Sequence, residues 1–322
     1  MIAVAHAISD RCRVEPIHPA IDVALSAFSP AVADRAAPLI RAALAPRIGS
    51  ERPDRWGRSR LTGDGFPFEL SFCTADHRLR FTAEPGAPDL APAHRLDAAV
   101  NLLQRLDACV APDIVDACRA LQRDAPLTYG AWIGCRVSGD GHALKLYVEV
   151  PEPARDVRVP VPPLVLPDRS VVMRMIACSN GAFESYARVP SLEPRHVPAI
   201  LAPAGVAHRA GELLELLSSA YGYSIRGRVP GPSVGVSYVS TGSDISRVTL
   251  YLFARSLWGS DARIRRQFVR LASAHGWDPQ TYLQVTAPMA ARDSWQTYHG
   301  LVGITLDGAA MSVAIGVRPV QP

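Results

Sequence analysis

Five times along the chain, two runs of strand-forming residues flank a short turn rich in Gly, Asp, Asn and Ser. This combination is typical of a β-hairpin. The five turns read, in chain order, TADH, SGDG, SNGA, STGSD and DGAA. Successive turns lie roughly 60 to 65 residues apart, except the second and third, which are roughly 40 apart, and such spacing is typical of a repeat architecture. We therefore expect residues 1–322 to fold as a single domain built from one repeated unit.

Between most of the hairpins the apolar residues change from a period of two to a period of 3.6, which predicts helices. The predicted helical segments are 30–48, 94–110, 112–122, 206–221, 261–275 and 279–291. The interval 151–167 is the exception, because its many prolines lack a backbone donor and clash with a preceding helical turn. There we expect an extended surface connection. The resulting element order is αββα, repeated five times.

Ten strands in one antiparallel sheet would leave two long edges, and closure into a barrel removes both. The helices must then coat the outside, because their apolar stripes need a sheet face to pack against. The expected fold is therefore α+β: a ten-stranded antiparallel β-barrel surrounded by helices, in five αββα repeats. In such a fold the outer face of the barrel is apolar, and the lumen is free to be polar.

The second strands of the first four hairpins support this polarity. Alternation places apolar side chains on one face and polar ones on the other, among them Arg78, Arg80, Lys145, Tyr147, Glu184, Tyr186, Arg247, Thr249 and Tyr251. The alternative is an ordinary half-exposed sheet whose polar face lies in water. The recurrence of a cation followed by Tyr favours the lumen.

Cations and phenol rings in one lumen suit a particular reaction. The cations bind a compact polyanion such as a diphosphate. The tyrosine faces stabilise a carbocation by roughly 0.5 to 2 kcal/mol each. Ionising an allylic diphosphate, and holding the resulting cation away from water until an aromatic nucleophile attacks, requires both features. That reaction is prenyl transfer.

The same strands resemble a known family. GFPFELSF followed by RLRFTAEP is similar to the first repeat of the soluble aromatic prenyltransferases with the ABBA fold (the PT barrel), in particular the dimethylallyltryptophan synthase branch. That branch has Pro-x-Glu-x-Ser on the first strand and an Arg four residues before Glu-Pro on the second. KLYVEVP resembles its Lys-x-Tyr strand, and RVTLY resembles its Arg-x-Lys-x-Tyr with Thr249 in place of Lys. The resemblance covers residues 61–319 as architecture, but only the first two repeats match closely in motif.

The resemblance implies a metal-independent transferase of secondary metabolism. It would move a dimethylallyl or longer prenyl group from its diphosphate, a co-substrate, to an aromatic acceptor, for which an indole such as tryptophan or an indole-containing peptide is the first choice. Glu69 would be the general base that takes up the proton lost on rearomatisation. The diphosphate would be bound by Arg80, Lys145, Arg247 and Arg174, and the carbocation would be shielded by Tyr147, Tyr186, Tyr251 and Tyr298. Lys145 is also the only lysine of the chain, and a compact ammonium is not equivalent to a guanidinium in a tight phosphate pocket.

Three departures from the family pattern bear on this interpretation. Glu184 stands where a cation is expected in the third repeat, Thr249 removes another, and Ala314 with Gly316 leaves the last strand without an aromatic side chain. Fewer cations predict weaker diphosphate binding, or else the small residues open space for a longer prenyl chain or a bulky acceptor. Two other functions therefore stay open: a barrel that binds an amphiphilic small molecule without chemistry, as a carrier or sensor, and a degenerate member that serves as an interaction protein.

Composition and motif searches argue against several other classes. The formal charge of +4 is too small to indicate nucleic acid as a partner. The apolar runs fall short of the ~20 residues needed to cross a bilayer, and no secretion signal is evident, so we expect a cytoplasmic protein. The six cysteines are expected to be free thiols. The sequence has no C-x-x-C or H-E-x-x-H spacing for a metal, no Gly-x-Gly-x-x-Gly loop for a nucleotide and no Gly-x-Ser-x-Gly elbow.

Overall fold

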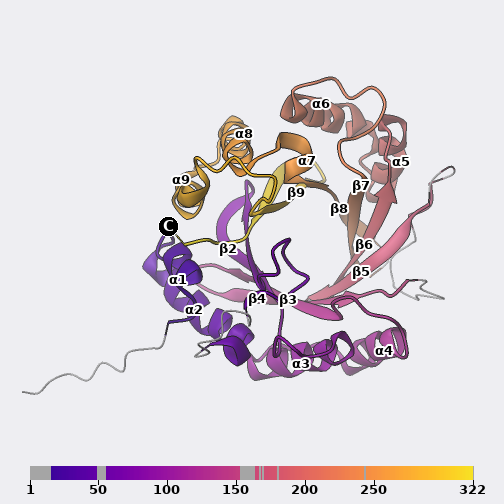
Figure 1. Cartoon of the computed structure of the whole chain (residues 1–322). Coiled ribbons are helices and arrows are strands. Elements are labelled where there is room, and N and C mark those ends of the chain that lie inside the picture. Colours follow the sequence, from indigo (N-terminus) through magenta and orange to yellow (C-terminus); the bar gives the residue numbers. More distant parts are fainter. Residues whose placement is uncertain are drawn as a thin grey trace, which may run out of the picture.

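A computed structural model of the chain describes residues 16–48, 56–152, 164–166, 168, 170–179, 181–242 and 244–321. Within these residues, ten strands form one closed barrel, seen almost end-on in Figure 1. Each strand pairs antiparallel with the next in sequence, and β10 closes on β1. The strands are β1 (Phe68–Cys73), β2 (Asp76–Ala83), β3 (Ala131–Val137), β4 (His142–Glu149), β5 (Val172–Ser179), β6 (Ala182–Pro190), β7 (Ser233–Thr241), β8 (Asp244–Phe253), β9 (His299–Asp307) and β10 (Ala310–Val317). The expected ten-stranded antiparallel barrel is confirmed.

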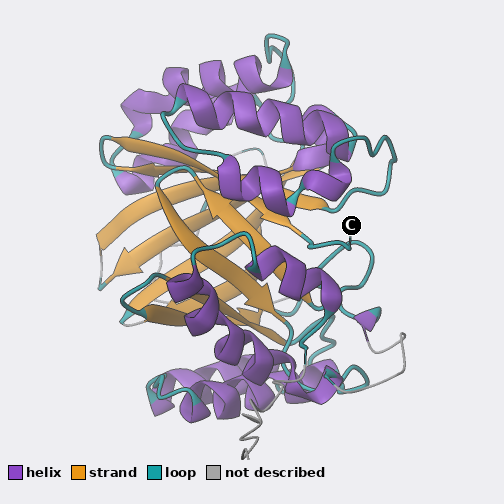
Figure 2. Cartoon of the chain, turned by 90° about the vertical axis from the view of Figure 1, so that its left-hand side faces the viewer, coloured by secondary structure: helices purple, strands orange, loops and turns teal. Residues whose placement is uncertain are grey.

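Helices surround the barrel on its outside (Figures 1 and 2). In the described residues they are α1 (Pro19–Leu25), α2 (Pro30–Leu44), α3 (Pro92–Arg105), α4 (Pro112–Gln122), α5 (Val197–Leu201), α6 (Ala210–Tyr221), α7 (Ala254–Trp258), α8 (Asp261–Ala274) and α9 (Gln280–Val285). Helices α1 to α4 all begin with a proline, which suits the first helical position because an N–H there has no intrahelical acceptor.

Four predicted helices begin or end at least four residues inside their expected bounds: the α-helical parts of 30–48, 94–110, 206–221 and 279–291 are α2, α3, α6 and α9. The segment 279–291 is α-helical only over α9 and continues as a short 3₁₀ turn, Ala287–Met289. The reason is Pro288, which has no N–H with which to continue the hydrogen-bond ladder.

The hydrophobic core lies between the barrel and its helices. In β1, Phe68, Leu70 and Phe72 are at most 4% exposed, whereas Glu69 and Ser71 alternate with them on the lumen side. Burying each such apolar side chain stabilises the fold by roughly 1.5 to 3 kcal/mol. Since this burial occurs on the outer face, the lumen does not have to be filled with apolar side chains for the barrel to be stable.

A buried ion cluster fixes the connections around the first hairpin. Glu84, directly after β2, accepts hydrogen bonds from Arg47 Nη2 at 2.8 Å and Ser59 Oγ at 2.9 Å. Arg95 of α3 lies 3.2 Å from the same carboxylate. All four residues are at most 5% exposed. Glu84 thus connects the end of β2 to the 3₁₀ turn after α2 (Ala45–Arg47), to the segment before β1 and to α3.

Some sequence expectations fall partly or wholly outside the described residues. They concern the N-terminus (1–15) and most of the expected extended connection, of which 153–163 and 167 are not described.

Within the described part, Cys73, Cys109, Cys118, Cys135 and Cys178 are free thiols. None of the described helices has the length and apolar character needed to cross a membrane.

The Glu84 cluster predicts a large loss of stability for Glu84→Gln. The substitution removes the negative charge beside the buried guanidinium groups of Arg47 and Arg95, and breaking a buried ion pair costs about 3 to 5 kcal/mol. Equilibrium urea unfolding measures the change. Asp97→Asn is the matched control, because its partner Arg119 is half exposed and such pairs contribute about 0 to 1 kcal/mol. Equal losses in the two variants would contradict the assignment.

Candidate active site in the barrel lumen

Polar side chains from consecutive strands line the lumen. The hydrogen-bonded register runs from Glu69 of β1 through Thr82 of β2 and Gly134 of β3 to Lys145 of β4, so Glu69 and Lys145 stand on one row of the sheet. The Lys145 side chain keeps 15% of its surface exposed. Because helices cover the outer face of the barrel, this surface borders space inside it.

Glu69 presents a carboxyl group without a partner. Nothing among the described residues forms a hydrogen bond or ion pair with it. Burial raises its pKa from the usual 4.5 to about 7. A carboxyl group that titrates near neutral pH and faces a lumen suits proton transfer from a bound ligand.

Glycines of β9 and β10 make room for the Glu69 side chain. A Cβ atom added to Gly316 would stand 2.7 Å from Glu69 Cδ, closer than such atoms approach, and a Cβ at Gly300 would also collide with the carboxylate. The space beside Gly316 is therefore occupied by Glu69. The expectation that Gly316 opens room for a longer prenyl chain or a bulky acceptor is wrong in this respect.

Three tyrosines form an arc along the opposite wall. The ring centroids of Tyr147 and Tyr186 lie 6.0 Å apart, and those of Tyr186 and Tyr251 lie 5.9 Å apart. Glycines accommodate these rings as well: a Cβ at Gly134 would stand 2.7 Å from the Tyr147 ring, and a Cβ at Gly235 would stand 3.1 Å from Tyr251. The rings thus lie against the neighbouring strands, with faces that stabilise positive charge.

Lys145 lies against this arc and is paired with Glu184. Its Nζ is 5.0 Å from the Tyr147 ring centroid and 5.6 Å from that of Tyr186. It forms an ion pair with the Glu184 carboxylate, which also accepts a hydrogen bond from Ser237 Oγ at 2.5 Å. Burial by itself lowers the pKa of Lys145, but the Glu184 carboxylate outweighs it and the pKa is raised. Burial raises the pKa of Glu184, yet Lys145 and the hydrogen bonds bring it below its usual value. Both groups are therefore charged at neutral pH.

Arg80 faces a second cation across the sheet. Its Nη2 binds Asp76 at 2.6 Å, while its Nη1 is buried and has no hydrogen-bond partner in the described part of the chain. Directly opposite on β3 is Arg136, an exposed residue whose charge lowers the pKa of Lys145. Like charges facing each other across two strands destabilise a sheet. Arg80, Arg136 and Lys145 thus lie on three consecutive strands, and such a group of cations has the chemistry to bind an anion.

The other predicted diphosphate residues have partners elsewhere. Arg247 lies at the hairpin end of β8 and binds Asp307 through Nη2 at 2.6 Å and Nε at 3.0 Å. Arg174 lies at an irregularity in β5 and pairs with Glu152 at 2.5 Å. The structure therefore groups Arg80 and Lys145, but engages Arg247 and Arg174 in separate, partly exposed ion pairs.

Tyr298 also stands apart from the tyrosine arc. It precedes β9, and its ring centroid lies 4.3 Å from the guanidinium carbon of Arg292 and 5.0 Å from that of Arg318. Its ring therefore already interacts with cations of the protein itself.

Two lumen features were missed from the sequence. Arg136 joins the cation group, and Trp132 stacks on Tyr129 at 4.0 Å with its indole Nε1 buried and unpaired among the described residues. Both belong to AWIGCRV, the first strand of its hairpin, in which alternation puts Trp132, Gly134 and Arg136 on one face. The same test that located Lys145 and Tyr147 on the second strand would have found them.

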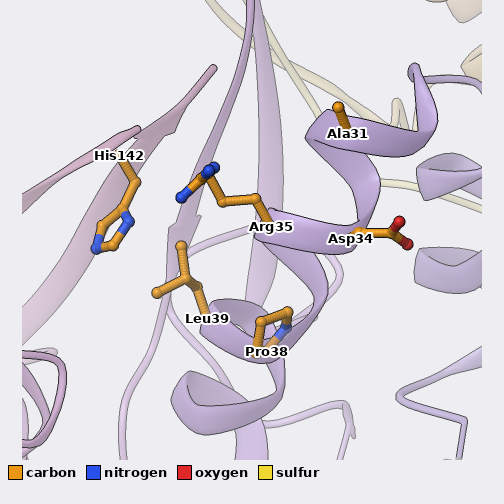
Figure 3. Close-up of a pocket in the computed structure, with 6 residues that line it drawn as sticks. All are labelled: Ala31, Asp34, Arg35, Pro38, Leu39 and His142. Atoms are coloured by element: carbon orange, nitrogen blue, oxygen red, sulfur yellow. The ribbon is translucent and has the colours of Figure 1, made fainter. Parts of the chain in front are cut away.

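Outside the barrel, a shallow pocket of about 400 Å³ lies between α2 and the β3–β4 hairpin (Figure 3). Its lining includes Asp34, Arg35 and His142, and Arg35 donates to the Gly139 carbonyl at 3.2 Å. It contains none of the predicted site residues. Across the described ranges, no group of three or more His, Cys, Asp or Glu side chains is arranged to hold a metal ion.

Comparison with known proteins links this barrel to solved structures. No protein-family model and no curated protein sequence matches the chain. Among solved structures, 6-dimethylallyltryptophan synthase from Micromonospora olivasterospora, in complex with DMASPP and Trp, is similar with a TM-score of 0.74 and 18% identity over 96% of this chain and 100% of that one. The 5-dimethylallyltryptophan synthase from Streptomyces coelicolor gives a TM-score of 0.73 at 17% identity, covering 94% of this chain and 95% of that one. AnaPT from Neosartorya fischeri gives 0.65 at 15% identity, covering 95% and 93%. The chain therefore has the ABBA barrel fold of the dimethylallyltryptophan synthases.

Proposed function

We propose that the protein is an aromatic prenyltransferase. It transfers a dimethylallyl or longer prenyl group from its diphosphate to an aromatic acceptor, an indole-containing small molecule or peptide being the first choice, and it does so without a metal ion. The observation that carries the proposal is the arrangement of three groups in one lumen: an unpartnered carboxyl group, an arc of tyrosines and a row of cations. The DMASPP and Trp in the similar Micromonospora enzyme support this choice of donor and acceptor.

The geometry suggests how the reaction proceeds. The donor diphosphate binds at Arg80, Arg136 and Lys145, where cations stabilise the negative charge of the leaving group. The allylic C–O bond breaks, and the electron pair leaves with the diphosphate. The allylic cation stays beside the faces of the tyrosine arc, which exclude water and stabilise its charge.

The acceptor completes the reaction. A carbon of its aromatic ring attacks the cation and forms the new C–C bond, and the ring then loses the proton at that carbon. Glu69, with a pKa of about 7, is the group positioned to accept this proton or the hydrogen bond of an indole N–H. The products are the prenylated acceptor, diphosphate and one proton.

A specific observation also favours the second candidate function, a barrel that binds an amphiphilic small molecule without chemistry. Asp76, Glu184 and Asp307 each neutralise one of the predicted cations, Arg80, Lys145 and Arg247. A lumen whose cations are paired in this way also suits a less charged ligand. Turnover of a prenyl diphosphate separates the two functions.

The direct test is incubation with dimethylallyl diphosphate and a panel of aromatic acceptors, including tryptophan and tryptophan-containing cyclic dipeptides, in EDTA. We expect an acceptor mass gain of one dimethylallyl group, detected by mass spectrometry. Longer prenyl diphosphates extend the donor panel. Absence of any product across both panels would overturn the proposal and favour the carrier.

A second test addresses Glu69. Because the carboxylate must be deprotonated to act as a base, kcat/KM of the wild type is expected to rise with pH and level off above about pH 7. Glu69→Gln is expected to lower kcat by roughly 10²- to 10⁴-fold and to remove this pH-dependent limb. Glu212→Gln, on exposed α6 and paired with Arg209, is the matched control. A Gln variant that retains the wild-type pH profile would exclude Glu69 as the base.

A third test uses the glycine beside Glu69. The added methyl group of Gly316→Ala collides with the Glu69 carboxyl group and is expected to reduce kcat at least tenfold, through displacement of the base, a loss of about 1.4 kcal/mol in transition-state stabilisation. Gly139→Ala, where no atom lies within 4 Å of the new Cβ, should behave as the wild type. Circular dichroism monitors folding, and full activity in Gly316→Ala would show that the position of Glu69 is not critical.

A further inference from the structure

Glu184 places a negative charge inside the group of lumen cations. It lies on β6, and Lys145 lies on β4, with β5 between them. The small side chain of Ala177 on β5 is the cross-strand neighbour of both Tyr147 and Glu184, so the ion pair can span this strand. Ser237 of the next strand, β7, holds the carboxylate from the other side at 2.5 Å. The Glu184 side chain is 9% exposed.

This pair has a direct consequence for any anion that enters the lumen. While the Lys145 ammonium is paired with Glu184, the carboxylate offsets its positive charge, so Lys145 attracts an anionic ligand less strongly. Moving the ammonium away leaves a buried carboxylate without a counter-charge, which is costly. Arg136, in contrast, has no carboxylate partner among the described residues, and Arg80 retains one unpaired buried nitrogen.

Building on the proposed function, we propose that Glu184 sets the affinity for the prenyl diphosphate by competing with the diphosphate for Lys145. The donor diphosphate first binds Arg136 and Arg80. It forms an ion pair with Lys145 only when the Lys145–Glu184 pair separates. The same carboxylate recaptures Lys145 after the reaction and so favours release of the diphosphate product. Glu184 is therefore a specificity-determining residue that keeps the site from retaining small polyanions.

The contact between Lys145 and the tyrosines supports this competition. The Lys145 ammonium lies near the faces of Tyr147 and Tyr186, where the allylic cation is proposed to reside. Two like charges cannot share this place without mutual repulsion. Movement of Lys145 toward the diphosphate would remove its ammonium from the space beside the two tyrosine rings. Binding of the donor would therefore also make room for the allylic cation.

The experiment is isothermal titration calorimetry with inorganic diphosphate in EDTA. We expect Glu184→Gln to lower the Kd at least tenfold relative to the wild type, because the amide releases Lys145. Glu152→Gln makes the same chemical change in the pair with Arg174 and is expected to alter the Kd less than twofold. An unchanged or weaker affinity in Glu184→Gln would overturn the proposal.

A mutant cycle distinguishes competition for Lys145 from simple repulsion between Glu184 and the ligand. In the wild-type background, Glu184→Gln is expected to raise the affinity for diphosphate. In the Lys145→Gln background, we expect the increase in affinity caused by Glu184→Gln to be at least fivefold smaller. An equal increase in affinity in both backgrounds would show that Glu184 simply repels the diphosphate, and it would overturn the proposal. Glu184→Asp keeps the charge but shortens its reach, and it is expected to lower the Kd about threefold even if the Gln variant proves unstable.

One further variant separates this inference from the proposed function. Arg136→Gln is expected to weaken diphosphate binding at least tenfold. If the wild type binds diphosphate and Arg136→Gln weakens it, while the Glu184 variants have no effect, the proposed function stands and the role of Glu184 fails. If neither the wild type nor any variant binds diphosphate, both fail.

Discussion

The closure of the sheet with its apolar face outward is the constraint on which the rest of the molecule depends. In most small barrels the interior must be filled by side chains to exclude water. Here the helices bury the outer face, as the exposures of Phe68, Leu70 and Phe72 show. The lumen contributes little to the hydrophobic core, so its residues are free to carry charge and phenol groups, and a substitution there changes chemistry more readily than it changes the fold.

Glycines determine where the lumen side chains lie. A large residue on one strand needs a neighbour without a side chain, because inward-pointing groups on adjacent strands converge. Gly134 stands beside Tyr147, Gly235 and Gly303 beside Tyr251, and Gly316 beside Glu69. Glycine weakens a strand because it loses more conformational freedom and has no side chain to pack. The closed hydrogen-bonded ring of the barrel tolerates this weakness, and the rings and the carboxyl group gain defined positions.

The architecture was largely predictable from the sequence, whereas the pairing of charges was not. Hairpin turns and alternation are local signals, and they located the strands and the inward face that carries Arg80 and Lys145, whereas Glu69 was singled out by the family resemblance of its strand. The partners of these groups come from strands far apart in the chain, and no local pattern encodes that Glu184 reaches Lys145 across β5. Arg247 and Tyr298 illustrate the same limit, because their neighbours Asp307 and Arg292 are set by the folded arrangement. Arg136 is different, since alternation on its own strand would have revealed it.

The lumen cations are paired with carboxylates of the protein itself because a buried charge needs a counter-charge for the chain to fold. A closed barrel that buried Arg80 and Lys145 without counter-charges would be destabilised, because each buried ion needs a partner. Asp76 and Glu184 supply those partners, whereas Arg136, which forms no ion pair with the described residues, is exposed and stays hydrated. A polyanion that enters must then replace internal carboxylates as partners of these cations. Under the proposed competition, affinity for a polyanion and the stability of the barrel are therefore opposed, and the internal carboxylates set the balance between them.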